Sequence, residues 1–145
     1  MTWAQILFLL NGLWFFAAFI QFSIAQTNTA KILVPRDARD NALVPTIKAS
    51  VAFLGGMNLA LALLAFYLAT APAAFAGAEQ QIVLFAFFAA ANFSQFWFNV
   101  PVAVRGGRIG QAYWPVFSGP MLTIFVIDAA LAVADAVAAF YISTN

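Results

Sequence analysis

Two aspartates, Asp128 and Asp135, lie in a long apolar stretch near the end of the sequence. A charged side chain in the middle of a bilayer costs at least about 2.5–3.5 kcal/mol, so acids in such stretches are candidate proton or cation sites. Asp128 is expected either to be protonated at neutral pH or to hold a cation. A protonated side chain with a purely structural role as a hydrogen-bond donor and a functional proton or cation site explain this residue equally well. Asp135 lies nearer the end of the stretch and is expected to be hydrated.

Amide side chains recur at similar depths in the other apolar stretches. Asn92, Gln95 and Asn99 are spaced i, i+3 and i+7, which places them on one stripe of a helix. Hydrogen bonds between membrane helices are the favoured explanation for the amides, at about 0.6 kcal/mol each. The alternative is a ligand- or ion-binding set, whose candidate members are Asp128, Asn58, Asn92, Asn11, Asp135, Gln95 and Asn99.

The sequence contains no cysteine and no histidine. Disulfides, zinc and iron–sulfur sites, thiol nucleophiles and histidine-based catalytic triads are therefore excluded. We predict no catalytic residues and no metal ligands, expect the chain not to be an enzyme, and leave the identity of any cofactor open.

The composition indicates an integral membrane protein. Of the 145 residues, 65% are hydrophobic and 8% are charged, whereas a soluble domain has about 25% charged residues. This composition excludes a soluble domain and a disordered chain, and a net charge of +1 without a basic stripe excludes a nucleic-acid-binding protein.

Four apolar runs are long enough to cross about 30 Å of hydrocarbon. We expect an all-α, single transmembrane domain over residues 1–145, with spans at about 3–24, 48–70, 80–104 and 116–143. Polar residues lie at matching positions in these spans, so the spans are predicted to form an integral membrane four-helix bundle with a polar interior and a Phe- and Leu-rich exterior. On the second span, Gly55, Asn58 and Ala62 share one face and allow close helix approach.

The basic residues predict the orientation. All six belong to the first and third connectors: Lys31, Arg36, Arg39, Lys48, Arg105 and Arg108. The positive-inside rule therefore places both connectors in the cytoplasm and both the N-terminus and the C-terminus on the non-cytoplasmic side. A multi-pass protein of the bacterial inner (plasma) membrane is expected.

The connectors and the aromatic residues suggest partners. Arg36, Arg39, Arg105 and Arg108 are candidates for contact with anionic lipid or an acidic partner, although a role in orientation alone is favoured. The third span is rich in aromatic residues, which suits a bulky apolar ligand such as a quinone, carotenoid or sterol-like lipid, and packing against bulk lipid explains them equally well. The alanine ridge of the fourth span suits close packing within the bundle or between protomers, and its residues are Ala129, Ala132, Ala136 and Ala139.

The four spans, the outward N-terminus and the long basic first connector resemble the MAPEG family of glutathione-dependent membrane enzymes. That family pairs a basic residue and an Asn with a Glu shortly after it on the second span. Here Asn58 is followed by the apolar residues 59–61, and Phe96, Trp97 and Phe98 replace the tyrosines expected on the third span. The resemblance therefore implies a topology but does not carry the activity over to this chain.

Three classes of function follow. The favoured one is a small non-catalytic membrane protein that binds an apolar, lipid-like ligand or serves as a homo-oligomer or a subunit of a larger membrane assembly. The second is a proton- or cation-coupled transporter or channel that uses Asp128, which would require oligomerisation in so short a chain. A MAPEG-like glutathione-dependent enzyme is the third.

Overall fold

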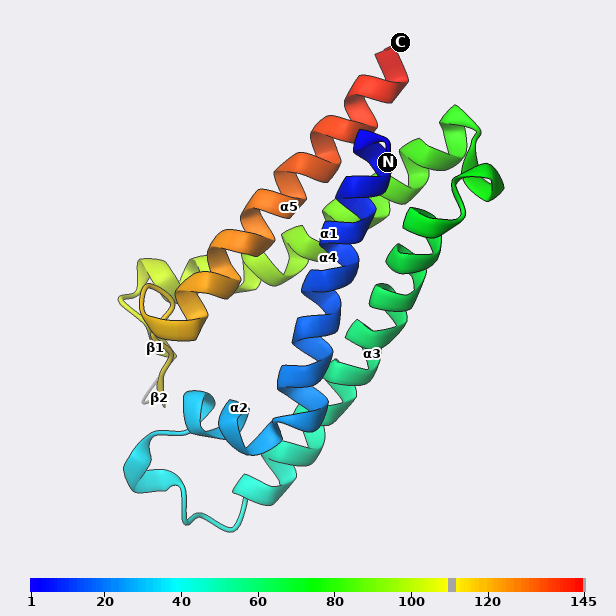
Figure 1. Ribbon diagram of the computed structural model, residues 1–145. Helices are drawn as coiled ribbons and strands as arrows, with labels where there is room; N and C mark the ends of the chain where they lie inside the picture. Colours follow the sequence, from blue (N-terminus) through cyan, green and yellow to red (C-terminus); the bar gives the residue numbers. More distant parts are fainter. Residues whose placement is uncertain (110–111, 145) are drawn as a thin grey trace. The chain divides into compact units, whose positions relative to one another are not determined.

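The computed structural model describes residues 1–109 and 112–144, and of Ile109, Ala112 and Tyr113 the backbone only. Within these residues the chain is all-α apart from one very short hairpin, and four of its five α-helices are long and apolar enough to cross a membrane. This supports the prediction of a multi-pass integral membrane protein. The chain divides into two compact units, Met1–Thr70 and Ala71–Asn145, which are described in turn (Figure 1).

The first unit is an antiparallel pair of helices, α1 (Trp3–Phe19) and α3 (Val44–Thr70). A capping box starts α1: Thr2 Oγ1 accepts from the Gln5 backbone N–H at 3.3 Å, and Gln5 Oε1 accepts from the Thr2 N–H at 2.8 Å. Gln5 Nε2 also donates to the Ala69 carbonyl at 3.0 Å, which ties the start of α1 to the end of α3.

Glycines let the two helices approach closely at two levels. A Cβ atom at Gly12 would lie 2.6 Å from the Phe66 ring, and one at Gly55 would lie 2.8 Å from the Ser23 backbone nitrogen. Both distances are shorter than real Cβ contacts, so only glycine fits without a shift. Phe16, about one turn after Gly12, packs edge to face against the same Phe66 ring, with the ring centroids 6.2 Å apart.

The connector of the first unit contains more structure than the predicted polar link over residues 25–47. A π-helix, η1 (Ile20–Ile24), continues α1, and α2 (Gln26–Leu33) and the short 3-10 helix η2 (Arg36–Ala38) follow. Helix α3 begins at Val44, ahead of the predicted start of the span at residue 48. An apolar cluster of Ala30, Val34 and Val44 holds this connector against α3.

The second unit is also a pair of long helices, α4 (Ala78–Val104) and α5 (Gly119–Thr144), preceded by the 3-10 helix η3 (Pro72–Phe75). Helices α4 and α5 pack along their length, and the Phe96 and Phe125 rings lie 4.7 Å apart. The fourth span was predicted to start at about residue 116, and the helix itself starts three residues later. The backbone takes a positive φ of 57° at Gly119, and the helix starts only there, with Pro120 in its first turn.

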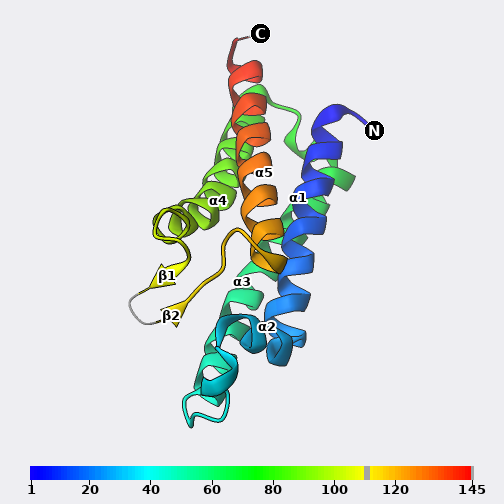
Figure 2. The ribbon, with the colours of Figure 1, turned by 90° about the vertical axis from the view of Figure 1, so that its left-hand side faces the viewer.

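A two-stranded hairpin lies between α4 and α5 and was not predicted. Strand β1 (Arg108–Ile109) pairs antiparallel with β2 (Ala112–Tyr113), as Figure 2 shows. Gly106 and Gly107 have φ values of 67° and 81°, a region that side chains with a Cβ atom rarely adopt. These two glycines allow the chain to leave α4 and turn into β1.

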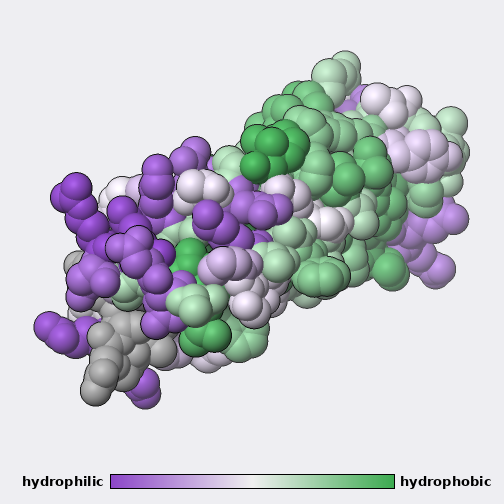
Figure 3. Space-filling view, turned by 90° about the horizontal axis from the view of Figure 1, so that it is seen from below, coloured by the Kyte–Doolittle hydropathy of each residue, from purple (hydrophilic) through white to green (hydrophobic). Residues whose placement is uncertain are grey.

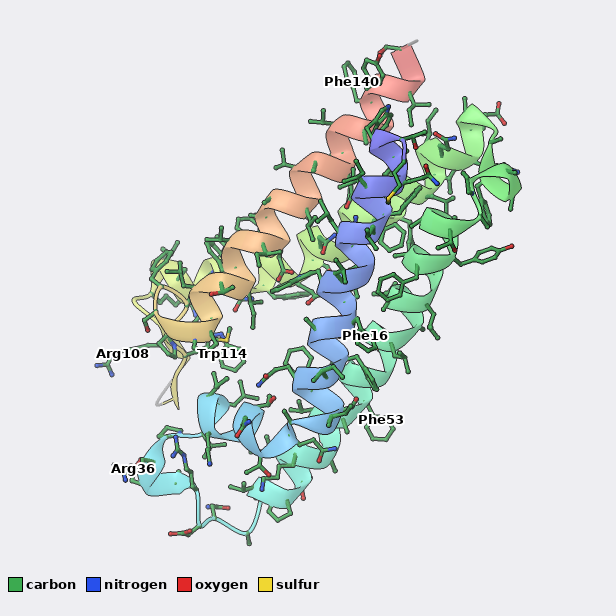
Figure 4. All side chains as sticks on the ribbon, viewed as in Figure 1. Phe16, Arg36, Phe53, Arg108, Trp114 and Phe140 are labelled. Atoms are coloured by element: carbon green, nitrogen blue, oxygen red, sulfur yellow. The ribbon has the colours of Figure 1, made fainter. Side chains whose placement is uncertain are left out.

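Large apolar side chains cover the outside of the helices. Phe53 and Phe140 point away from the helices that carry them (Figure 4), and Phe53 is 80% exposed. Figure 3 shows broad hydrophobic surface, with hydrophilic residues gathered toward one side of the view. The predicted Phe- and Leu-rich exterior is therefore observed, although Phe85 and Phe88 of the aromatic third span are buried.

Candidate functional site

Among the described residues of the second unit, three polar side chains are fully buried: Asn92 on α4, and Asp128 and Asp135 on α5, each with 0% exposure. Asn92 Nδ2 donates to Asp135 Oδ2 at 3.4 Å and to the Phe88 carbonyl at 3.1 Å. The expectation that Asp135 is hydrated is therefore wrong. Its carboxylate packs against α4, and a depth counted along one helix could not reveal that partner.

Asp128 and Asp135 are seven residues apart and lie on the same face of α5. Both are buried together with Leu131 and Ala138 of that helix. At 1.5 Å per residue, the two carboxyl groups are about 10 Å apart along the axis, too far to share one proton directly. In the described part of the chain, no three acidic side chains come together as they would around a metal ion.

The other amides predicted on the Asn92 stripe lie closer to the hairpin. Asn99 Nδ2 donates to the Gln95 carbonyl at 2.8 Å, and Asn99 Oδ1 accepts from Trp114 Nε1 at 3.0 Å. Asn99 thus anchors the indole of Trp114, which follows β2 (Figure 4). Asn99 therefore has a structural role: it holds the connector between α4 and α5 against the end of α4.

The amides of the first unit are also buried. Asn11 on α1 donates from Nδ2 to the Leu7 carbonyl at 3.1 Å, and Asn58 on α3 donates to the Leu54 carbonyl at 2.7 Å. Asn58 is only 7% exposed, and its Oδ1 accepts no hydrogen bond from any described residue. Gly55 and Ala62 are buried on the same side of α3, as predicted.

An apolar groove of about 440 Å³ runs between α4 and α5. Alanines provide most of its lining and two phenylalanine rings stand at one part of it, and the lining residues are Ala89, Ala90, Phe93, Phe96, Ala129, Ala132, Val133 and Ala136. Its volume lies within the range of about 300–1,000 Å³ that is usual for small-molecule sites. Small side chains on both helices leave this space, because larger ones would fill it.

The groove and the buried acids occupy different faces of the α4–α5 pair. Residues 129, 132, 133 and 136 of α5 line the groove, whereas 128, 131 and 135 are buried outside it, and Ala132 is both buried and groove-lining. With 100° between successive residues, these sets are centred roughly a third of a turn apart. No acidic side chain is among the groove-lining residues, so an apolar ligand there would not compete with a cation for the carboxylates.

The four arginines predicted to contact lipid or a partner differ in their surroundings. Arg36, Arg105 and Arg108 are exposed, and Arg36 and Arg108 point away from the chain (Figure 4). Arg39 is half-buried and donates from Nη2 to the Lys31 carbonyl at 2.7 Å and from Nε to the Val34 carbonyl at 3.2 Å. Arg39 therefore holds the C-terminus of α2, a task that the sequence did not indicate.

Several polar contacts were missed in the sequence. Gln21 Nε2 donates to Thr29 Oγ1 at 3.0 Å, the Thr29 hydroxyl donates to the Gln21 carbonyl at 2.6 Å, and Ser23 Oγ donates to the Ala52 carbonyl at 3.0 Å. These bonds hold η1 against α2 and α3. Among the contacts that were missed, only the capping box of Thr2 and Gln5 could have been predicted, from its Thr-x-x-Gln spacing.

No protein-family model, curated protein or solved structure matches this chain. The resemblance to the MAPEG family thus stays a similarity of predicted topology.

Proposed function

We propose that this chain is a small, non-catalytic, multi-pass membrane protein that holds an apolar, lipid-like ligand in the groove between α4 and α5. The observation that carries the proposal is the lining of the groove, which consists entirely of Ala, Val and Phe side chains. Such a surface binds by shape and dispersion contacts and would select flat or chain-like apolar molecules. Phe93 and Phe96 would stack against a ring or an unsaturated chain.

The proposal includes the predicted topology. The four long helices would form one bundle in a bacterial inner membrane, with both termini on the non-cytoplasmic side. The distribution of cations supports this orientation, because all six Lys and Arg residues lie between α1 and α3 or between α4 and α5, or within a few residues of those segments.

A second protein helix would also fit against this groove. Stripes of small residues let membrane helices approach closely, so the exposed part of the alanine ridge would also suit a homo-oligomer or a larger membrane assembly. A membrane lipid or another membrane protein is the expected partner in this proposal, and nucleic acid is not.

The test fills the groove. Ala136 is exposed and lines it, so Ala136→Phe would occupy the space, whereas Val137→Phe places the same ring on the neighbouring position outside the groove. Native mass spectrometry from mild detergent reports bound molecules and oligomeric state together. We expect wild type and the Val137→Phe control to retain an apolar adduct that Ala136→Phe loses.

Other results would change the assignment. Loss of a dimer peak in Ala136→Phe, with no adduct in any variant, would assign the groove to a second copy. A monomer without any adduct in wild type would refute the ligand proposal.

A proton- or cation-transport function is the second candidate. It is favoured by the two fully buried carboxyl groups of α5, one of which is hydrogen-bonded to Asn92 on α4. Buried acids in membrane helices are used as proton relays and cation sites.

Proteoliposomes separate this candidate from the first. If transport is the function, Asp128→Asn abolishes proton or cation flux while the protein stays folded, and Ala136→Phe leaves the flux intact. Wild-type vesicles that carry no more flux than empty ones would eliminate this candidate.

A further inference from the structure

Two cations are presented to solvent at the connector end of the first unit. Lys31 on α2 and Arg36 on η2 are exposed, and Arg36 points away from the connector (Figure 4). The other two basic residues there already have partners: Arg39 bonds the carbonyls at the end of α2, and Lys48 Nζ lies 3.3 Å from Thr27 Oγ1. Arg39 and Lys48 thus hold the connector in place while Lys31 and Arg36 face outward.

An apolar groove of about 550 Å³ begins at the same end. It follows the first turns of α3 and is lined by Leu43, Thr46, Ile47, Ser50, Val51 and Leu54. From Val44 to Leu54 this stretch of helix is about 15 Å long. The groove therefore leads from the charged connector into the membrane-spanning part of α3.

The groove and the cationic connector belong to one packed structure. Ile47 lines the groove and also packs against the cluster of Ala30, Val34 and Val44. The Val34 carbonyl accepts the hydrogen bond from Arg39. The groove therefore lies beside the end of α2, next to the segment that carries Lys31 and Arg36.

We propose that this surface binds one anionic phospholipid, with the phosphate paired to Lys31 and Arg36 and one acyl chain in the groove along α3. Charge and polarity identify the occupant: a negative group is needed at the polar end, and an apolar chain at the other. The connector and the start of α3 carry four cations (Lys31, Arg36, Arg39, Lys48) and two acids (Asp37, Asp40), a net charge of +2. Basic residues at the membrane surface attract anionic headgroups in this way.

Thr46 and Ser50 do not make the groove a polar site. Ser50 Oγ donates to the Thr46 carbonyl at 2.9 Å, so this hydroxyl is satisfied within its own helix. What remains on the groove surface is mainly the carbon atoms of Leu43, Ile47, Val51 and Leu54. The proposal does not rest on the α4–α5 groove, because the two sites share no residue.

The experiment measures binding of phosphatidylglycerol and phosphatidylcholine to the delipidated full-length protein by native mass spectrometry, with matched pairs of variants. Lys31→Gln/Arg36→Gln removes the exposed cations, and Arg105→Gln/Arg108→Gln removes the same charge from the second unit. Ser50→Phe fills the groove, and Ala49→Phe places a ring on the neighbouring exposed position outside it. Thermal unfolding of each variant shows that it is folded.

We expect wild type to retain one phosphatidylglycerol in preference to phosphatidylcholine. The Lys31/Arg36 double variant should weaken this binding on the order of thirtyfold, the loss estimated for two surface cations. Ser50→Phe should weaken binding of both lipids, and the two controls should bind as wild type does.

Three results would overturn the proposal. Equal retention of the two lipids would show that charge plays no part. An equal loss in both double variants would reveal a general attraction rather than a site. A dimer that disappears in Ser50→Phe would give the groove to a second copy of the chain.

Discussion

The asparagines of the long helices share one pattern of hydrogen bonding. Asn11, Asn58, Asn92 and Asn99 each donate from Nδ2 to the backbone carbonyl four residues earlier in the same helix. One amide hydrogen of each is thereby satisfied within its own helix. Asn99 also accepts from Trp114 Nε1 through its Oδ1 and so links α4 to the connector that follows it.

The sequence predicted which polar residues are buried better than it predicted their bonds. Asn92 and Asp128 are buried as their positions in the spans predicted, whereas Asp135 was expected to be hydrated and is also buried. The sequence did not predict the contact between Asn92 and Asp135, because that contact depends on the axial offset between α4 and α5. The connector sets this offset, and its glycine turns and hairpin leave little periodic signal.

We predict that the Asn92–Asp135 contact couples α4 to α5. In a double-mutant cycle with Asn92→Ala and Asp135→Ala, the coupling free energy of unfolding should be about 0.6–1.7 kcal/mol, the range found between membrane helices. Unfolding in mixed detergent micelles, followed by circular dichroism, measures it. Additive effects of the two substitutions would mean that the 3.4 Å contact contributes nothing.

Of the two adjacent glycines of α3, Gly55 and Gly56, only Gly55 lies against the η1 segment that continues α1. A Cβ atom at Gly55 would collide with Ser23, whereas one at Gly56 would have nothing within 4 Å. We predict that Gly55→Ala lowers the free energy of unfolding by about 1–3 kcal/mol, since it forces the helices apart.

Gly56→Ala is the matched control for that change. It should be neutral or raise stability by up to about 1 kcal/mol, because alanine favours the helix. Thermal unfolding of both variants in the same detergent makes the comparison. Similar melting temperatures for the two would show that the close approach at Ser23 is not needed.

The long helices could be predicted from hydrophobicity, but the short elements of the connectors could not. Helix α2 lacks a side-chain N-cap at Ala25 and is only eight residues long, so propensity alone would not form it. Tertiary bonds hold it instead: the Gln21–Thr29 pair near its start and Arg39 at its end.

We predict that Arg39→Gln loosens the end of α2. The amide of Val34, which donates to the Ala30 carbonyl at 2.8 Å, should exchange with deuterium about three- to tenfold faster, the loss expected for partly exposed charged hydrogen bonds. Hydrogen exchange with mass spectrometry of the peptide over residues 26–38 detects this. Arg36→Gln, which removes an exposed guanidinium, should leave that peptide unchanged, and a similar effect of both variants would contradict the role of Arg39.

The orientation proposed for the whole chain is directly testable because the sequence has no cysteine. Single cysteines at Asp40, Arg108 and Glu79 each create one labelling site; Asp40 and Arg108 lie in the connectors, and Glu79 is exposed in the first turn of α4. In intact bacterial cells, a membrane-impermeant maleimide should label Glu79→Cys and leave Asp40→Cys and Arg108→Cys unlabelled until the cells are opened. Labelling of Asp40→Cys and Arg108→Cys from different sides would refute the four-span topology.

The π-helix Ile20–Ile24 is a point at which the chain can be shortened by one residue. There the Ala25 N–H reaches back to the Ile20 carbonyl at 2.8 Å, one residue further than in an α-helix. A deletion of Phe22 would let this wide turn rewind as ordinary α-helix and keep Ser23 opposite Gly55. The same deletion at Leu13 would rotate the preceding part of α1 by about 100° and carry Asn11 off its buried face. Natural or engineered shortening of this protein should therefore be tolerated in the π-turn and rejected a few residues earlier.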